Sequence, residues 1–411
     1  MRPRMSNRGL TAVVFAACLG LGAVPARAQS ADPYTPGRVY GRVAVGGDVT
    51  ILASPRDDRA FFNYTDYELN ALRMVRLRGL GEFRPHRRLS FVGELRVEDL
   101  SVSAAALFVR WRPFGTETLE VQAGRIPPVF GAFPRRAYGR DNAVLGTPLA
   151  YQYLTSLRPD ALPAIVDDLL RMRGRGWQPS YPIGSSAVAP GLPLVSASKW
   201  DTGVQVTYHQ AWLQLAGAVS RGSPAAPVVR DQNDGLAISG RAAAMLPGGV
   251  VLGVSGARGQ WIDDSVLALV SPGGHPPASQ SVFGVDGEAG FEHWVVRAEW
   301  LHSAFELPIV LAHEPNRTIR AHSGFVELRY RPWARWQFGV RVERLLFGPV
   351  YGTLELQPPQ AWEAKVDRVE GVLGYRVTRH VELRGGWQEN WRDGGRVHQM
   401  GYPTAALMVW F

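Results

Sequence analysis

Apolar and polar residues alternate along most of the chain beyond residue 66, and this period of two predicts β-strands. In the segment 75–83, Leu77 and Phe83 share one set of positions, whereas Arg76 and Arg78 occupy the positions between them. Successive side chains of an extended chain point to opposite faces. One face of this segment is therefore apolar and the other is ionic.

The same alternation recurs in seven tight hairpins, each made of two strands around a short turn. They cover residues 75–97, 107–123, 204–215, 236–254, 283–300, 326–342 and 369–383. Seven hairpins give fourteen strands, and Val39–Val45 and Ala405–Phe411 add one at each end of the chain. Bacterial outer-membrane barrels have an even number of strands. We predict an all-β fold, a closed antiparallel transmembrane β-barrel of about 16 strands.

Long links join the hairpins, except for the short link near Asp99 to Ser101. They are polar or rich in Gly and Pro, and they cover residues 47–66, 127–200, 222–235, 258–280, 303–318, 346–364 and 389–396. Short periplasmic turns and long extracellular loops are typical of outer-membrane barrels. Aromatic residues on the apolar face, close to strand ends, suit interfacial girdles; they are Trp111, Tyr208, Trp300, Tyr330, Trp336 and Tyr375.

A large soluble β-sandwich or propeller is the alternative fold. No fixed-period motif recurs, which disfavours a propeller. A soluble protein would also turn its ionic face outward, whereas here an apolar band occurs on nearly every strand. No apolar run after residue 28 approaches the length of about 20 residues that a spanning helix needs, so a closed barrel is the membrane fold that remains.

The first residues resemble a signal peptide. Arg2, Arg4 and Arg8 precede the apolar stretch Leu10–Val24, and an Ala-x-Ala site ends at Ala28. We expect residues 1–28 to be removed and residues 29–411 to form the barrel. The single cysteine of the chain lies in the removed part, which excludes disulfides from the mature protein.

The chain carries a moderate excess of positive charge. The formal net charge of +9 falls to +5 without residues 1–28, which hold four Arg and no acid. The chain has two lysines, Lys199 and Lys365, and the rest of its lysine-plus-arginine total is arginine. The cations are scattered and form no basic arm, so no nucleic-acid partner is expected.

The ionic face of the strands should line the barrel interior if the apolar face meets lipid. Sixteen strands enclose enough room for an aqueous channel, and water would remove the need to pair each charge. The alternative is a set of cross-strand ion pairs that stiffen the wall and select nothing. The candidate pore-lining cations are Arg76, Arg78, Arg96, Arg110, Arg112, Arg297, Arg329, Arg341, Arg368 and Arg384.

The link 127–200 is long enough to indicate a function. Residues 161–172 have apolar residues at helical spacing, and Gly174 is a plausible stop. We predict that this loop either narrows the lumen as a constriction or caps the mouth as a lid on neighbouring loops. The candidate arginines of the constriction are Arg135, Arg136, Arg171, Arg173 and Arg175.

The segment Leu119–Pro128 resembles the strand of phosphate-selective porins that enters a long loop through a Gly-x-[Phe/Ile/Leu]-x-Pro-Pro/Phe stretch. Those proteins are Gram-negative sixteen-stranded barrels that pass anions with arginines and a lysine ladder. Two lysines cannot supply that ladder, so phosphate selectivity is not carried over. The resemblance implies a bacterial outer-membrane location, lipid contacts, assembly-machinery recognition through Phe411, and a homotrimer as an assembly to consider.

We predict a channel or porin for passive diffusion of small hydrophilic solutes, with some preference for anions. A plugged structural or surface-interaction barrel is the alternative, and an outer-membrane hydrolase is a further one. The sequence contains no Gly-x-Ser-x-Gly and no His-Glu-x-x-His motif. We therefore expect no enzyme activity, no catalytic residues, no metal site and no cofactor.

Overall fold

The computed structural model describes residues 38–57, 72–98, 101–136, 141–197, 200–227, 235–273, 278–308, 317–352, 358–394 and 397–411. The signal peptide expected at residues 1–28 lies outside these ranges.

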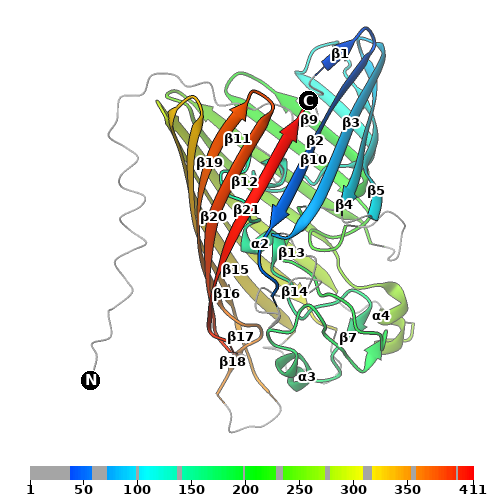
Figure 1. Ribbon diagram of the computed structural model, residues 1–411. Helices are drawn as coiled ribbons and strands as arrows, with labels where there is room; N and C mark the ends of the chain where they lie inside the picture. Colours follow the sequence, from blue (N-terminus) through cyan, green and yellow to red (C-terminus); the bar gives the residue numbers. More distant parts are fainter. Residues whose placement is uncertain are drawn as a thin grey trace.

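Sixteen strands form a closed antiparallel barrel, which confirms the predicted fold (Figure 1). Each strand pairs with its neighbours, and pairing of the first with the last closes the cylinder, with Asp48 opposite Trp410. The strands are β2 Val43–Ala53, β3 Met74–His86, β4 Leu89–Glu98, β5 Ser101–Trp111, β6 Leu119–Ile126, β9 Asp201–His209, β10 Leu213–Ser220, β11 Ala237–Leu246, β12 Val250–Gln260, β13 Ser279–Phe291, β14 Trp294–Glu306, β15 Thr318–Trp333, β16 Trp336–Phe347, β19 Val366–Thr378, β20 Val381–Arg392 and β21 Gln399–Trp410.

The seven predicted turns lie together at one end of the barrel, and the long loops lie at the other (Figure 1). The β11–β12 turn contains Gly248 and Gly249, both at positive φ, a conformation that glycine adopts without steric strain. The C-terminus lies at the turn end. The barrel therefore has a turn end and a loop end, which correspond to the expected periplasmic and extracellular rims.

The first strand begins later than the predicted Val39–Val45. The chain folds back at Gly41, which has a φ of 60°, and the short strand β1, Arg38–Tyr40, pairs with the start of β2. β2 then continues to Ala53, into the predicted link. Polar residues such as Asp48 and Thr50 face the interior there and obscured the apolar pattern in the sequence.

β16 shows most plainly that apolar residues face outward and charged residues face inward. Its residues alternate without exception between exposed and buried. Phe338, Val340 and Val342 are 41%, 44% and 53% exposed on the outer surface. Arg341 and Glu343 are 0% and 3% exposed on the inner surface. The outward apolar side chains form the belt that faces lipid in an outer-membrane barrel.

Trp300 corrects the predicted girdle. It is the seventh of the 13 residues of β14, and it packs edge-on against Phe283 with ring centroids 6.4 Å apart. The other girdle candidates lie close to the turn end, where Trp336 contacts Tyr375 at 4.8 Å. One aromatic rim is therefore present at that end, and Trp300 lies midway up the wall.

The loop end carries several small elements: α3 Val166–Arg171, α4 Asp264–Val270, and the paired short strands β7 Ala161–Leu162 with β8 Ile183–Gly184 and β17 Pro349–Val350 with β18 Gln360–Ala361. The helix predicted over residues 161–172 is shorter than expected because Ala161 and Leu162 pair with β8. Gly174 does lie just beyond it, at a φ of 73°. Among the residues that the structure describes, no helix is long and apolar enough to cross a membrane.

Candidate functional site

Residues 127–136 and 141–157 of the long loop lie inside the barrel along its inner wall, with α2 Leu149–Gln152 among them (Figure 1). We call this stretch the inserted segment. Its apolar residues Phe133, Leu149 and Leu157 have 1% exposure or less. Phe133 meets Phe325 of β15 at 6.3 Å, edge to face. The inserted segment is therefore packed as tightly as a protein core.

Wall carboxylates hold the inserted segment by its backbone. Glu370 Oε1 accepts hydrogen bonds from the N–H groups of Leu145, at 2.9 Å, and Gly146, at 2.8 Å. Glu343 Oε2 accepts one from Leu149 N–H at 2.6 Å. A buried N–H needs an acceptor, and a carboxylate is a strong one. These glutamates fix the segment against β16 and β19.

Glu299 on β14 binds the segment at a second point. Its Oε2 accepts hydrogen bonds from the N–H groups of Ala132, at 3.1 Å, and Phe133, at 3.2 Å. The Tyr151 hydroxyl donates to the other oxygen of this carboxylate. Burial, together with the charge of Glu299, raises the pKa of Tyr151 well above its ordinary value, so the phenol stays protonated as a donor.

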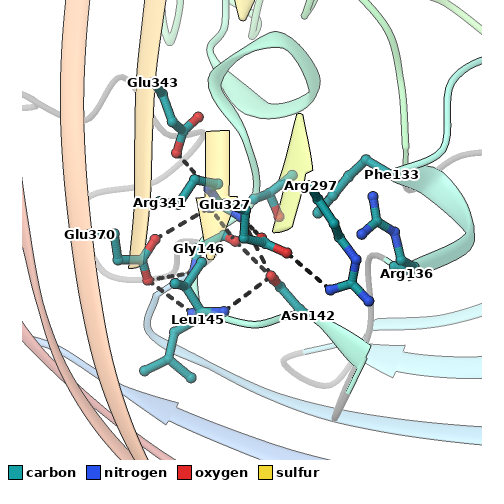
Figure 2. A network of polar contacts seen from close by, with 12 residues as sticks. Phe133, Arg136, Asn142, Leu145, Gly146, Arg297, Glu327, Arg341, Glu343 and Glu370 are labelled. Carbon is teal, nitrogen blue, oxygen red and sulfur yellow. Dashed lines mark hydrogen bonds and ion pairs between the residues drawn. The ribbon is translucent and has the colours of Figure 1, made fainter. Parts of the chain in front are cut away.

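Arg341 occupies the centre of the network (Figure 2). Its guanidinium donates to Glu343 at 2.8 Å and to the Gly146 carbonyl at 2.6 Å. It also lies 3.4 Å from Glu327 and 3.3 Å from Glu370. A buried charge is tolerated when it is paired and hydrogen-bonded on every side. Arg341 therefore neutralises the carboxylates that hold the backbone.

Two further arginines reach the segment from neighbouring strands. Arg384 donates to the Asn142 carbonyl at 2.6 Å, and Arg368 donates to the Thr147 carbonyl at 3.2 Å. Asn142 itself donates to the Gly146 carbonyl at 2.9 Å. The wall thus supplies acceptors for N–H groups and donors for carbonyl groups of the same short stretch.

All ten predicted pore-lining arginines lie on the inner face of the wall. Three of them, Arg341, Arg368 and Arg384, contact the inserted segment. Seven are buried, namely Arg76, Arg96, Arg110, Arg297, Arg341, Arg368 and Arg384, and three retain more exposure, namely Arg78, Arg112 and Arg329. Whether these side chains meet a solute stays a prediction.

Most of the interior arginines have carboxylate partners. Arg110 lies 3.0 Å from Glu120, and Arg96 lies 2.9 Å from Glu94. Arg241 pairs with Asp286 at 2.5 Å. The pairs of Arg110 and Arg241 join different strands, as the wall-stiffening alternative expected, whereas Arg96 and Glu94 lie on the same strand β4.

The predicted constriction arginines separate into two groups. Arg136 lies in the inserted segment, 3.7 Å from Glu288, whereas the side chain of Arg135 lies outside the described part of the structure. Arg171, Arg173 and Arg175 lie on or just after α3 at the loop end, and Arg171 pairs with Asp168. The loop thus divides into the inserted segment inside the barrel and a part around α3 at the loop end, which together with α4 we call the lid. Whether either part narrows or caps the lumen stays a prediction.

An apolar cluster joins the lid to the inserted segment. Leu169 of α3 and Val266 of α4 belong to the same buried cluster as Leu149, Leu301 and Phe305. Leu301 and Phe305 point inward from the loop-end half of β14, where an ionic, water-lined wall was expected. That expectation was wrong there, because the inner wall is apolar where it covers the loop.

The sequence did not reveal the backbone-binding role of Glu299, Glu343 and Glu370. Their positions on the inner face followed from the alternation, but no motif marks a carboxylate that binds loop N–H groups. A weaker signal existed for the apolar cluster. Neighbouring apolar pairs such as Trp300–Leu301 and Leu345–Leu346 break the alternation, which indicates burial on both faces.

Comparison with known proteins gives structural neighbours only, since no family model and no curated protein matches the sequence. The anion-selective porin from Comamonas acidovorans aligns with a TM-score of 0.56 and 9% identity over 90% of this chain and 99% of that one. A loop-deletion form of OmpT, an outer membrane protein of Vibrio cholerae, aligns with a TM-score of 0.54 and 10% identity over 90% of this chain and 99% of that one. The outer membrane channel DcaP of Acinetobacter baumannii aligns with a TM-score of 0.51 and 10% identity over 92% of this chain and all of that one. The chain thus has the fold of porin-like bacterial outer-membrane β-barrels.

Proposed function

We propose that the protein is an outer-membrane channel for passive diffusion of small hydrophilic solutes, narrowed by the inserted segment. The observation that carries the proposal is a charged strip of inner wall that holds this segment in one position by its backbone, around Arg341 and Glu370. Under this proposal, the fixed segment narrows the path that solutes take along the lumen. The structural neighbours named as porins and channels support the same function.

A preference for anions is the finer part of the proposal. The mature chain carries a formal charge of +5 by the count above, and 39 of its 41 lysine-plus-arginine residues are Arg. A net positive potential raises the local concentration of anions. We also propose that the barrel has no enzymatic activity, because the arrangement of its interior is accounted for by loop attachment.

The proposed partners follow from the surface. Outer-membrane lipids would cover the apolar belt, and the assembly machinery would recognise the terminal strand. Phe411 continues the ladder beside β2 through hydrogen bonds with Gly47 and is 52% exposed. We propose a homotrimer as the assembly, since OmpT of Vibrio cholerae is described in a trimer form.

Planar-bilayer recording of the purified protein tests the function. We expect stepwise currents, with a reversal potential in a potassium chloride gradient displaced toward the chloride potential. Detergent alone and an unrelated eight-stranded barrel serve as controls. Currents without anion preference would contradict only the finer part.

A plugged structural or surface-interaction barrel is the second candidate, and the dense packing of the interior favours it. Arg341 and Leu149 have no exposed surface. Absence of current from correctly folded protein, judged by its heat-modifiable migration on gels, would favour this candidate over the channel.

A further inference from the structure

A cavity of about 390 Å³ lies at the turn end, beside β15, β16, β19 and β20. Arg331, Gln337, Arg376 and Glu382 line its wall, and the turn Trp333–Trp336 lines its rim. We call it the turn-end pocket. It lies outside the network that holds the inserted segment.

In the described part of the chain, no acid pairs directly with the cations of the turn-end pocket, and Glu382 and Asp141 act on Arg331 only from a longer distance. Among the described residues, no carboxylate lies within ion-pair distance of Arg331, Arg335 or Arg376. The one acid of the lining, Glu382, pairs with Arg384 at 2.6 Å. Three guanidinium groups beside one cavity therefore leave an excess of positive charge.

Unused hydrogen-bond donors accompany this charge. Gln337 is 4% exposed, and its Nε2 has no partner in the described structure. Its Oε1 accepts from Arg331 Nε at 2.8 Å and Nη2 at 2.6 Å, which fixes the orientation of the amide. Arg376 Nε is also buried without a partner. Buried donors without acceptors are rare and suggest an occupant that supplies them.

The inserted segment lies at the inner end of the lining. Gly339 follows Gln337 on the inner face of β16, and a Cβ there would collide with the Ala143 carbonyl. Gly374 of β19 lies between Gln337 and Glu382 in the same way, with Gln337 Cβ 3.6 Å from its added Cβ. Both positions are therefore filled, Gly339 by the inserted segment and Gly374 by neighbouring side chains, and they mark the inner limit of the turn-end pocket.

We propose that the turn-end pocket binds an oxyanion, a phosphate or carboxylate group, through Arg331, Arg376 and Gln337. Guanidinium groups match the planar or tetrahedral oxygens of such anions through paired hydrogen bonds. The group comes either from a free solute or from a phospholipid headgroup at the adjacent rim. A free solute at this position deepens the proposed channel function, and only its effect on currents rests on that function.

Calorimetric titration with inorganic phosphate tests the site on the full barrel in nonionic detergent. We expect saturable binding that weakens at least about tenfold when Arg331 and Arg376 are both changed to Gln, because charge-assisted hydrogen bonds are lost. Arg84→Gln, near another turn and paired with Glu82 at 2.6 Å, is the matched control and should bind as the unmodified protein does.

A second variant keeps the test informative if the double change impairs folding. Gln337→Glu preserves size and places a built-in carboxylate against Arg331 and Arg376. We expect phosphate binding to disappear while the barrel stays folded.

Native mass spectrometry with phosphatidylglycerol tests whether the occupant is a phospholipid headgroup. Retained lipid that is lost in both pocket variants, without phosphate binding, would assign the occupant as a headgroup. Binding of neither probe, or equal loss in Arg84→Gln, would overturn the site. Phosphate binding without any bilayer current would leave the site intact and refute the channel instead.

Discussion

The barrel interior uses arginine differently at two levels. At mid-height, Arg341 has three carboxylates within 3.4 Å and no exposed surface. At the turn end, Arg331 and Arg376 lie on the same inner face, yet no described carboxylate pairs with them. The difference shows that an inward arginine alone does not indicate a solute path. Its partners decide whether it holds the fold or remains available to a ligand.

Removing the paired arginine should give the largest effect. Arg341→Leu leaves Glu343 and Glu370 close together without this cation, although Glu327 keeps Arg297 at 3.2 Å. The change should lower the free energy of unfolding by about 3–5 kcal/mol. Chemical unfolding in detergent measures it. The inserted segment should also loosen and the bilayer conductance should rise. Arg376→Leu is the matched control, and its effect should stay below about 1 kcal/mol; equal losses would remove the distinction between the two levels.

The next largest effect on the free energy of unfolding should come from apolar packing. Two leucine-to-alanine changes compare the inside of the barrel with its outer surface. Leu149→Ala opens a cavity at a residue of 0% exposure and should cost about 2–5 kcal/mol. Leu373→Ala truncates a residue that is 43% exposed on the outer surface, where detergent or lipid fills the space. We expect a clearly smaller loss there. The same unfolding assay compares both variants, and the reverse order would argue against a packed inserted segment.

The lid should respond to pH through Asp263, the residue before α4. Burial, with added repulsion from Asp160 and Asp264, raises the pKa of Asp263 from 3.8 to about 6. The folded protein holds this proton more tightly than the unfolded chain, so the lid gains stability as the pH falls through about 6. Hydrogen exchange of α4 at pH values of about 7 and 5 measures it. Asp263→Asn should remove the pH dependence; an unchanged dependence would assign it to another group.

The lid arginines should have the smallest effect. Arg171 and Arg175 are exposed at the loop end, so salt screens their charge. Changing Arg171, Arg173 and Arg175 together to Ala should reduce anion preference at about 0.01 M salt, where the screening length is about 30 Å, and not at about 1 M. Reversal potentials at both salt concentrations test this expectation. No change at low salt would exclude these residues from the path.

The wall was predictable because lipid outside and charge inside impose a strict period of two. The hairpins, the strand total and the inward direction of Arg341 and Glu343 all followed from it. The contacts of the loop did not follow, because Glu370 binds N–H groups that every residue other than proline possesses. The turn-end pocket was equally hidden, since Arg331, Gln337 and Arg376 come from three different strands and meet only through the register between them.

The attachment of the inserted segment by its backbone has a consequence for variation. Glu370 and Glu343 bind main-chain atoms, so substitution of Leu145 or Thr147 leaves those bonds chemically possible. Gly146 is different, because a Cβ there would lie 2.7 Å from Glu370 Oε2 and 2.8 Å from Gln388 Nε2. The other side chains of this stretch can therefore diverge between homologues, or be exchanged by design. Gly146 must stay, because it lets the inserted segment lie against Glu370.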